Sequence, residues 1–312
     1  MRTSPIRVVS YNVRYFGHAL KGLASTRSSE RRIAAGLAAL APLADVVCLQ
    51  EIETISVRSR LARGRAAPGE TQLMSFMAEL QRAFARTGQT FPYDGFYFRA
   101  HANRIRGLSI TTHGLAIVVN TERLRVESHN VDSPAHITHH HVERFRDRKQ
   151  GRICAHMSVV DASGRRLHVF NTHLSLPTPF ARAFWTRRER MGWGVNQLHE
   201  AHTLAAYVHR HARAEPFVVC GDFNAQPASP VFRYLTESAG FRCAERDLGL
   251  LEGSSYPTAG FMRMRMHLDH IFYGNGARFL DLDGTSPYGD RSSRFAGLSD
   301  HVPLIGRMRW EE

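Results

Sequence analysis

The chain has 312 residues, of which 43% are hydrophobic and 22% are charged, so it can bury a sizeable core. This composition excludes an intrinsically disordered chain, a collagen-like rod and a miniprotein held together by disulfides. Because 41 Lys and Arg residues outnumber 28 Asp and Glu residues, the formal net charge is +13, which favours an anionic partner such as nucleic acid or an acidic membrane surface.

Short apolar runs recur along the whole chain and predict buried strands. In chain order they cover residues 6–10, 46–49, 115–119, 153–160, 167–170, 217–220 and 268–273. Apolar residues spaced three to four apart predict helices over residues 33–40 and 73–84, and a further helix is expected from about residue 187 to 213. Residues 161–164 have the composition of a hairpin turn, and Ser229 with Pro230 predicts a helix start whose end is Gly240. Hairpins mixed with helix-linked strands predict a layered α/β domain with mixed sheets.

Two stretches rich in basic residues, 58–70 and 132–152, indicate loops. Either could close over a polyanion, or both could be ordinary solvated loops. The second contains His136 and three consecutive histidines at 139–141. These do not predict a metal site, because consecutive side chains point in different directions.

Trp185 and Trp193 lie close in sequence to a group of arginines, Arg182, Arg187, Arg188 and Arg190. Aromatic rings interleaved with arginines could stack on bases and hold phosphates, or insert into a membrane interface. Packing in the core, or anchoring a helix to a loop, is an equally open interpretation of the two tryptophans.

The four cysteines, Cys48, Cys154, Cys220 and Cys243, are widely spaced and form no Cys-x-x-Cys pair. The sequence therefore supports neither a zinc ribbon nor a redox motif. Cys48 and Cys220 stand in apolar runs, where a reduced cysteine is a small buried hydrophobe. With no signal-peptide pattern and no apolar run that approaches the roughly 20 residues of a membrane span, we expect a soluble protein of a reducing compartment, the cytoplasm.

Polar residues recur at the ends of the predicted strands, where loops can carry chemistry on a rigid scaffold. The segments are Ser10-Tyr11-Asn12, Gln50-Glu51, Asn171-Thr172-His173, Gly221-Asp222-Phe223-Asn224, His267-Leu268-Asp269-His270 and Ser299-Asp300-His301. Carboxylates and carboxamides suit Mg²⁺ or Mn²⁺, and such an ion polarises a phosphoryl oxygen. A histidine whose second nitrogen is held by a carboxylate moves a proton near neutral pH. If the segments converge, they can support metal-dependent hydrolysis of a phosphoester.

The residue types suggest a chemical role for each candidate residue. Glu51, Asn12 and Asp300 are candidate metal ligands, and Asp269 with His301 could form the carboxylate–imidazole pair. Another set could act on the phosphate, with His173 donating to a non-bridging oxygen and Asn224 holding the group in line. Taken singly these signals are weak, since a lone glutamate is usually solvated and Asp222 alone could cap a turn.

The order and spacing of the motifs carry more weight. Asn-Val-Arg, Leu-Gln-Glu, Asn-Thr-His-Leu, Gly-Asp-Phe-Asn-Ala, Leu-Asp-His-Ile and Ser-Asp-His-Val-Pro-Leu follow one another between residues 12 and 304. In that order they resemble the endonuclease/exonuclease/phosphatase superfamily, which has the deoxyribonuclease-I-like fold. The resemblance implies a single domain over residues 1–312. It also implies a four-layer α/β sandwich, in which two packed mixed β-sheets are flanked by helices.

The resemblance also implies roles for individual residues. Asn12 and Glu51 would organise the metal, magnesium or manganese, with Asp300 near it. His173 would contact the phosphate, and Asp222 and Asn224 would position the phosphate and the nucleophile or leaving group. His301 would be the base, oriented by Asp269.

Two departures bear on the substrate. Branches related to abasic-site endonucleases carry an acidic residue two positions after the first Asn and a Lys two positions after the metal Glu, whereas Arg14 and Glu53 stand here. This disfavours a role in abasic-site repair. Asn-Thr-His is similar to the branch that contains deoxyribonuclease I, deadenylases, neutral sphingomyelinases and inositol polyphosphate phosphatases, which share a reaction and differ in substrate.

We therefore predict a magnesium-dependent nuclease that acts on DNA or RNA. The alternative is a phospholipid or phosphoinositide phosphohydrolase that works at an anionic membrane surface, with the basic loops on the membrane. A catalytically dead binding module is disfavoured, because no proposed site residue is replaced by an inert one. The sequence gives no sign of an obligate protein partner.

Overall fold

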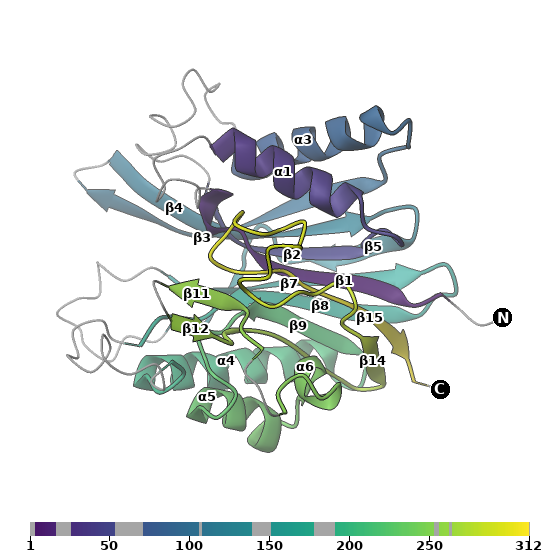
Figure 1. Cartoon of the computed structure of the whole chain (residues 1–312). Coiled ribbons are helices and arrows are strands. Elements are labelled where there is room, and N and C mark those ends of the chain that lie inside the picture. Colours follow the sequence, from purple (N-terminus) through teal and green to yellow (C-terminus); the bar gives the residue numbers. More distant parts are fainter. Residues whose placement is uncertain are drawn as a thin grey trace.

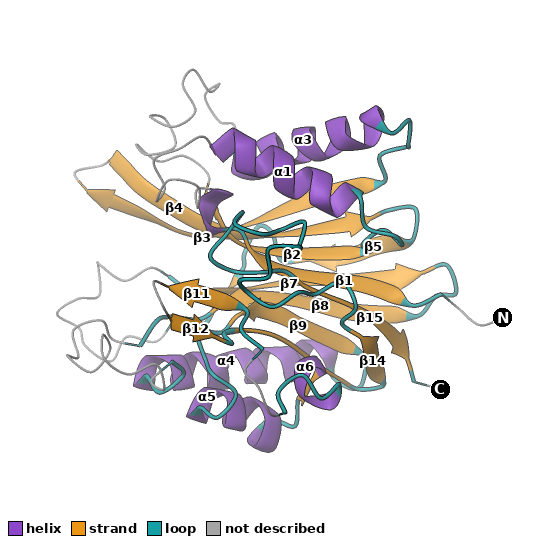
Figure 2. Ribbon diagram, in the orientation of Figure 1, coloured by secondary structure: helices purple, strands orange, loops and turns teal. Residues whose placement is uncertain are grey.

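The computed structural model describes residues 4–16, 26–53, 71–105, 108–138, 151–177, 191–252, 256–261 and 264–311. Two large β-sheets pack face to face, and helices cover the outer face of each (Figures 1 and 2). The expected four-layer α/β sandwich with two mixed sheets is confirmed. No helix of the described residues is long and apolar enough to cross a membrane.

The first sheet has the strand order β14-β15-β1-β2-β4-β3. Its parallel pair is β1 with β2, and the other neighbours are antiparallel. The strands are β1 (Ile6–Asn12), β2 (Val46–Glu53), β3 (Tyr93–Ile105), β4 (Leu108–Asn120), β14 (Ala277–Asp281) and β15 (Leu304–Trp310). A 3-10 turn, η1 (Arg14–Phe16), follows β1 directly.

The second sheet has the order β10-β13-β9-β8-β7-β5, with β6 also paired to β7. Its parallel pair is β8 with β9. The strands are β5 (Leu124–His129), β6 (Ala135–His136), β7 (Ile153–Asp161), β8 (Arg166–His173), β9 (Phe217–Asp222), β10 (Arg242–Cys243) and β13 (Asp269–Gly274). Two short strands, β11 (Ala259–Phe261) and β12 (Met264–Met266), form a separate two-stranded sheet, and Ala259 also makes an isolated antiparallel bridge with His301.

The outer layers are helical. α1 (Thr26–Ala38) and α3 (Gln72–Arg86) cover the first sheet, while α4 (Val195–Ala212), α5 (Pro230–Arg233), a π-turn η5 (Tyr234–Ser238) and α6 (Ala244–Asp247) lie on the second (Figure 1). Thr71 caps α3 by accepting a hydrogen bond from the Met74 N–H, which satisfies one of the unpaired amides of the first turn.

Alternation along the strands builds three apolar layers. In β1, Ile6 and Val8 lie in the core between the sheets, whereas Val9 and Tyr11 pack beneath α1 and α3. A third apolar layer joins the second sheet to α4 and α5. Because successive side chains of a strand point to opposite faces, the alternation decides which polar residues at the strand ends face the other sheet.

The elements predicted from the sequence are present. The hairpin turn at residues 161–164 joins β7 to β8, and Gly164 has a φ of +79°. Ser229 caps α5 by accepting from the Phe232 N–H. The helix expected from about residue 187 begins at Val195, and residues 178–190, including Trp185, lie outside the described residues.

The two basic stretches are only partly described. The first, 58–70, lies wholly outside the described residues, as do 139–150 of the second. The ends of the second stretch are ordered by pairing, because His136 of β6 lies opposite Ile153 of β7. Arg152, the last residue of this stretch, directly precedes the first residue of β7.

A polar bridge ties the two sheets together beneath the site. The Gln50 side-chain amide donates to Oδ1 of Asn171 at 2.8 Å, and Asn171 Nδ2 donates to the carbonyls of Leu49 and Ala116 at 3.0 Å each. Both carboxamides are fully buried. Since buried polar groups are costly unless they are hydrogen-bonded, this network fixes how the two sheets face each other.

Candidate active site

Three of the predicted residues form a row across the second sheet. Asp222 of β9 lies opposite His173 of β8 on one side and opposite Asp269 of β13 on the other. In β9, Val218 and Cys220 belong to the core between the sheets, and the two-residue repeat puts Asp222 on the same face. The row therefore faces the first sheet at the edge of that core.

Glu51 reaches the site through an irregularity in β2. The register between β2 and β4 shifts between Leu49 and Ile52, and Glu51 has a φ of +58°. Such a bulge breaks the two-residue alternation. Gln50 and Glu51 are therefore both turned toward the second sheet, although they are adjacent in sequence.

Asp222 lies at the centre of the network. Its Oδ2 atom accepts a hydrogen bond from Asn12 Nδ2 at 3.0 Å and lies 3.5 Å from His173 Nε2 and 3.7 Å from His301 Nε2. The same Asn12 amide nitrogen donates to Glu51 Oε1 at 3.2 Å. Burial raises the pKa of Asp222 to about 7, with the nearby Asp269 and Glu51 carboxylates adding to the rise and His301 opposing it.

A carboxylate and a hydroxyl hold His301 in place. His301 Nδ1 lies 2.9 Å from Asp269 Oδ2, which in turn accepts a hydrogen bond from the Thr258 hydroxyl at 2.6 Å. Burial acts to lower the pKa of His301, but the carboxylates of Asp269, Asp222 and Asp300 outweigh it and raise the pKa well above its ordinary value. The site is thus built to stabilise a protonated imidazole.

The Gly-Asp-Phe-Asn segment has a conformation that explains its residue types. A side-chain carbon on Gly221 would lie 2.4 Å from the Thr172 carbonyl oxygen, so only glycine allows β8 and β9 to approach this closely. Asn224 has a φ of +48°, a left-handed conformation that asparagine tolerates. There its N–H donates to Asp222 Oδ1 at 2.9 Å, and its Nδ2 lies 3.2 Å from His173 Nε2.

Asp300 approaches the site from the loop before β15. Its carboxylate forms an ion pair with Arg14, whose guanidinium is partly exposed. The neighbouring Ser299 hydroxyl donates to the Asn12 carbonyl at 2.8 Å and accepts from the His301 N–H at 3.2 Å. Arg14, Tyr15 and Phe16 all have φ values between 44° and 55°, a strained conformation that is concentrated at functional sites.

The donor set at the centre suits a hard divalent cation. Ligand atoms of Glu51, His173 and Asp222 all lie within 4.8 Å of one another. Burial and the nearby Asp300 carboxylate raise the pKa of Glu51, with His301 and Asn12 opposing them. Several carboxylates that repel one another in a buried site form a group that a cation would stabilise, and oxygen ligands favour magnesium or manganese.

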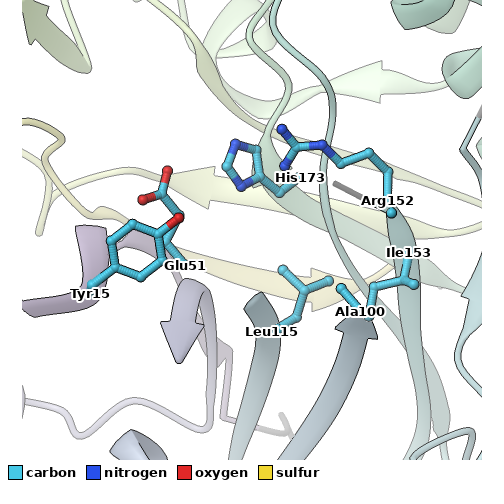
Figure 3. Close-up of a pocket in the computed structure, with 9 residues that line it drawn as sticks. Tyr15, Glu51, Ala100, Leu115, Arg152, Ile153 and His173 are labelled. Atoms are coloured by element: carbon cyan, nitrogen blue, oxygen red, sulfur yellow. The ribbon is translucent and has the colours of Figure 1, made fainter. Parts of the chain in front are cut away.

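A small pocket opens beside this group. It is lined by Glu51, His173, Tyr15 and Arg152 together with apolar side chains of β3, β4 and β7. Figure 3 shows the Arg152 guanidinium extending toward the His173 ring across the pocket from Glu51. The buried Nε of Arg152 has no hydrogen-bond partner among the described residues, and the side chain adds a positive charge to the pocket wall.

The structure brings all eight sequence-predicted residues, Asn12, Glu51, His173, Asp222, Asn224, Asp269, Asp300 and His301, into one connected network. Sequence reasoning missed Thr258, which carries no motif and lies 11 residues before the Asp269 that it contacts. It also did not single out Arg152 among the many basic residues of its stretch. Trp193 is 55% exposed, so the core-packing interpretation of this tryptophan is wrong.

Comparison with protein families gives one match over nearly the whole chain. The model described as "Endonuclease/Exonuclease/phosphatase family" matches residues 9–301. Among curated proteins, human nocturnin is 30% identical over 155 residues, which cover 46% of this chain and 33% of nocturnin. Mouse nocturnin is 29% identical over 162 residues, 48% of this chain and 35% of the relative. The matched region thus spans only about a third of these relatives.

Solved structures share the fold over the whole chain. The human nocturnin catalytic domain with a bound sulfate anion superposes with a TM-score of 0.61 at 20% identity, covering 98% of this chain and 94% of that one. ANGEL2, described as a 2′,3′-cyclic phosphatase, gives a TM-score of 0.65 at 16% identity, with coverage of 99% and 96%. A mannosyl-6-phosphatase of Bacteroides thetaiotaomicron gives 0.60 at 15% identity, with coverage of 98% and 100%. At these identities the likeness concerns the fold alone.

Proposed function

The chain belongs to the endonuclease/exonuclease/phosphatase family, and within it we propose a divalent-metal-dependent phosphodiesterase that hydrolyses the phosphodiester bonds of DNA or RNA. The observation that carries this proposal is the position of Asp222 Oδ2, within 3.0 to 3.7 Å of Asn12, His173 and His301. One carboxylate thus joins the candidate metal ligands to the candidate base. That arrangement is useful for attack on phosphorus.

Magnesium or manganese held at Glu51, with Asn12 supporting it and Asp300 nearby, would polarise a phosphoryl oxygen and neutralise the charge that develops on it. His301 takes the proton of the attacking water at Nε2, and Asp269 stabilises the imidazolium that results. His173 donates to a non-bridging phosphate oxygen, while Asn224 fixes the His173 ring and keeps the phosphate in line. Asp222 orients the water and the amide of Asn12.

The charge near the pocket supports a polyanionic substrate. Arg152 lines the pocket, and Arg14 stands at Asp300 with its side chain 41% exposed. Together with the net charge of +13, these residues favour a substrate that carries phosphates on both sides of the bond to be cleaved. ANGEL2, which shares this fold, has been crystallised with adenosine-2′,3′-vanadate, which is consistent with a nucleic-acid phosphate as the ligand here.

A specific observation favours a second candidate. The side chains of Leu176, Trp193 and Val195 are 47%, 55% and 55% exposed. The two segments that carry them are in contact, since a side-chain carbon added at Gly194 would lie 3.2 Å from the Cα of Pro177. Exposed apolar side chains grouped close to the end of β8 could enter an anionic membrane. Under this alternative the enzyme is a phospholipid or phosphoinositide phosphohydrolase.

One substrate panel separates these possibilities. Plasmid DNA, single-stranded DNA, RNA, sphingomyelin vesicles and phosphoinositide vesicles are each incubated with the enzyme in magnesium, manganese or chelator. We expect cleavage of DNA or RNA with either metal, none with chelator and none by His301→Ala. Hydrolysis of the lipids alone would establish the alternative, and a rate that chelation leaves unchanged would contradict a metal-dependent mechanism.

A further inference from the structure

A second group of metal-ligating side chains lies on the other face of the second sheet. Cys243 ends β10, Glu245 lies on α6, and His267 and His270 lie just before and within β13. His270 follows Asp269 directly, so the alternation of β13 turns its side chain away from the candidate active site. The ring packs near Phe232 and Phe272. Cys243, Glu245 and His270 are fully buried and His267 is 5% exposed. This group takes no part in the proposed hydrolysis.

Donor atoms of Cys243, Glu245 and His270 lie close together, and His267 Nε2 approaches this group at Glu245. The Cys243 Sγ lies 3.3 Å from Glu245 Oε2, while His270 Nδ1 and His267 Nε2 lie 3.5 and 3.6 Å from Glu245 Oε1. The donor atoms of Cys243, Glu245 and His270 all lie within 4.8 Å of one another. In a tetrahedral zinc site, ligand bonds of about 2.0–2.3 Å place neighbouring ligand atoms about 3.3–3.7 Å apart. The contacts of Glu245 Oε1 with the two histidines and of Glu245 Oε2 with Cys243 have this length.

The outer nitrogen of each imidazole is already engaged. His267 Nδ1 lies 2.5 Å from the Tyr256 carbonyl oxygen, and His270 Nε2 lies 2.8 Å from the Ala225 carbonyl oxygen. A carbonyl can only accept, so these nitrogens carry the hydrogen, and in a neutral ring the inner nitrogen presents a lone pair to Glu245. Metal-binding histidines are held by this kind of outer hydrogen bond.

The inner nitrogens, His267 Nε2 and His270 Nδ1, have no hydrogen-bond partner among the described residues. If either ring were an imidazolium paired with Glu245, a charge-assisted hydrogen bond of about 2.7–2.9 Å would be expected. The observed separations of 3.5 and 3.6 Å are too long for that bond. Each inner nitrogen thus faces the buried Glu245 carboxylate without a hydrogen bond to it, an arrangement that a cation bound between them would satisfy.

We propose that Cys243, Glu245, His267 and His270 bind a structural zinc ion. A thiolate and a carboxylate carry two negative charges, which a divalent ion neutralises inside the protein, and sulfur and imidazole ligands select zinc over magnesium. The ion would fasten β10 and α6 to β13. Through the His270 bond to Ala225 it would also fasten the segment that follows Asn224, so it would support both segments that carry the catalytic carboxylates.

The sequence alone does not predict this zinc site. Its ligands follow the spacings Cys-x-Glu and His-x-x-His, and the two pairs are 22 residues or more apart. A search for Cys-x-x-Cys pairs therefore passes over it. Only the pairing of β10 with β13, in which Cys243 lies opposite Phe272, brings the two pairs together.

The metal content of the untagged wild-type protein is the direct test. After purification without chelator and gel filtration in metal-free buffer, elemental analysis should find about one zinc per chain. The matched cleft variant Glu51→Gln should keep this zinc, and Cys243→Ala should lose it. The proposal is overturned if protein refolded with zinc retains none, or if Glu51→Gln loses the zinc while Cys243→Ala keeps it.

Cobalt substitution provides a readout that does not depend on variants of uncertain stability. Protein refolded with Co²⁺ in place of zinc should show a near-ultraviolet thiolate-to-cobalt charge-transfer band and the visible bands of a tetrahedral ion. Cys154→Ala, which removes a buried thiol elsewhere, should leave both. Wild-type spectra that lack the thiolate band would exclude Cys243 as a ligand and overturn the assignment.

Discussion

The imidazole of His301 stands between two carboxylates, with Nδ1 2.9 Å from Asp269 Oδ2 and Nε2 3.7 Å from Asp222 Oδ2. The shorter contact fixes the ring, and the longer one exceeds hydrogen-bond distance. Asp269 is itself held by the Thr258 hydroxyl. The order Thr258, Asp269, His301 thus runs from a fully buried residue to the edge of the cleft, and each group positions the next.

Replacing Asp269 by asparagine should reduce turnover while preserving the fold. The amide can neither hold Nδ1–H in the required tautomer nor stabilise the imidazolium, so we expect kcat to fall on the order of 10³–10⁴-fold. Thr258→Val should lower kcat by about tenfold and leave KM unchanged. The measurement is steady-state kinetics on the best substrate, with circular dichroism as the fold check and the loop variant Asp290→Asn as control. Wild-type turnover in Asp269→Asn would remove the pair from the mechanism.

Glu51→Gln should raise the metal requirement. The substitution keeps the size of the side chain and its contact with Asn12 but removes the negative charge, so the magnesium concentration for half-maximal activity should increase by about tenfold or more. Activity is measured across a magnesium titration. The control is Glu127→Gln, because Glu127 pairs with Arg166 on the surface. Identical titration curves for Glu51→Gln and wild type would exclude Glu51 as a metal ligand.

The sequence was most informative where alternation and motif agreed. Asp222 and Asp269 end or begin apolar runs of strands, so their approach to the cleft follows from a two-residue repeat once the strands are paired. Glu51 could be recognised only by its motif, because the bulge in β2 reverses the face that the repeat assigns to it. The motif therefore identifies Glu51 correctly, although strand alternation alone would place its side chain on the opposite face of β2.

Other contacts depend on tertiary packing that no local pattern encodes. Thr258 reaches Asp269 because the segment before β11 crosses the start of β13. The Ile271 N–H donates a hydrogen bond to the carboxylate of Glu245, which lies on a helical turn 26 residues earlier in the chain. A hydroxyl or a carboxylate in such a segment resembles any solvated side chain in the sequence, so neither residue could have been selected without the fold.

Arg152→Gln should weaken substrate binding more than turnover. The guanidinium lines the pocket beside Glu51 and His173, so its loss removes one contact to phosphate. For a nucleic-acid substrate we expect KM to rise about tenfold, and the slope of binding against salt on a double-logarithmic plot to fall by about one. Arg210→Gln, on the exposed side of α4, is the matched control. An unchanged salt slope would mean that Arg152 does not contact the substrate.

The acid sensitivity of folding should depend on His156. This ring is stacked on Phe170 with centroids 4.4 Å apart, and its Nε2 lies 2.9 Å from His168 Nδ1. Burial lowers the pKa of His156 to about 3, with His168 and His211 contributing. Above pH 6.5 the His156 ring is neutral in both the folded and the unfolded chain. Below pH 6.5 the ring binds a proton in the unfolded chain, whereas in the folded chain it stays neutral down to about pH 3. This residue therefore makes folding less favourable as the pH falls.

The slope expected from one such group is at most about 1.4 kcal/mol per pH unit between pH 6.5 and 3. His156→Gln should lower the free energy of unfolding at pH 7.5, because the ring stacking is lost, by about 1 kcal/mol. It should then lose less stability than wild type on acidification, so that the two curves converge. Urea denaturation at pH 7.5, 6.5, 5.5 and 4.5 measures this, with the exposed His199→Gln as control. Parallel curves for His156→Gln and wild type would show that the buried ring is not the group that the unfolded chain protonates.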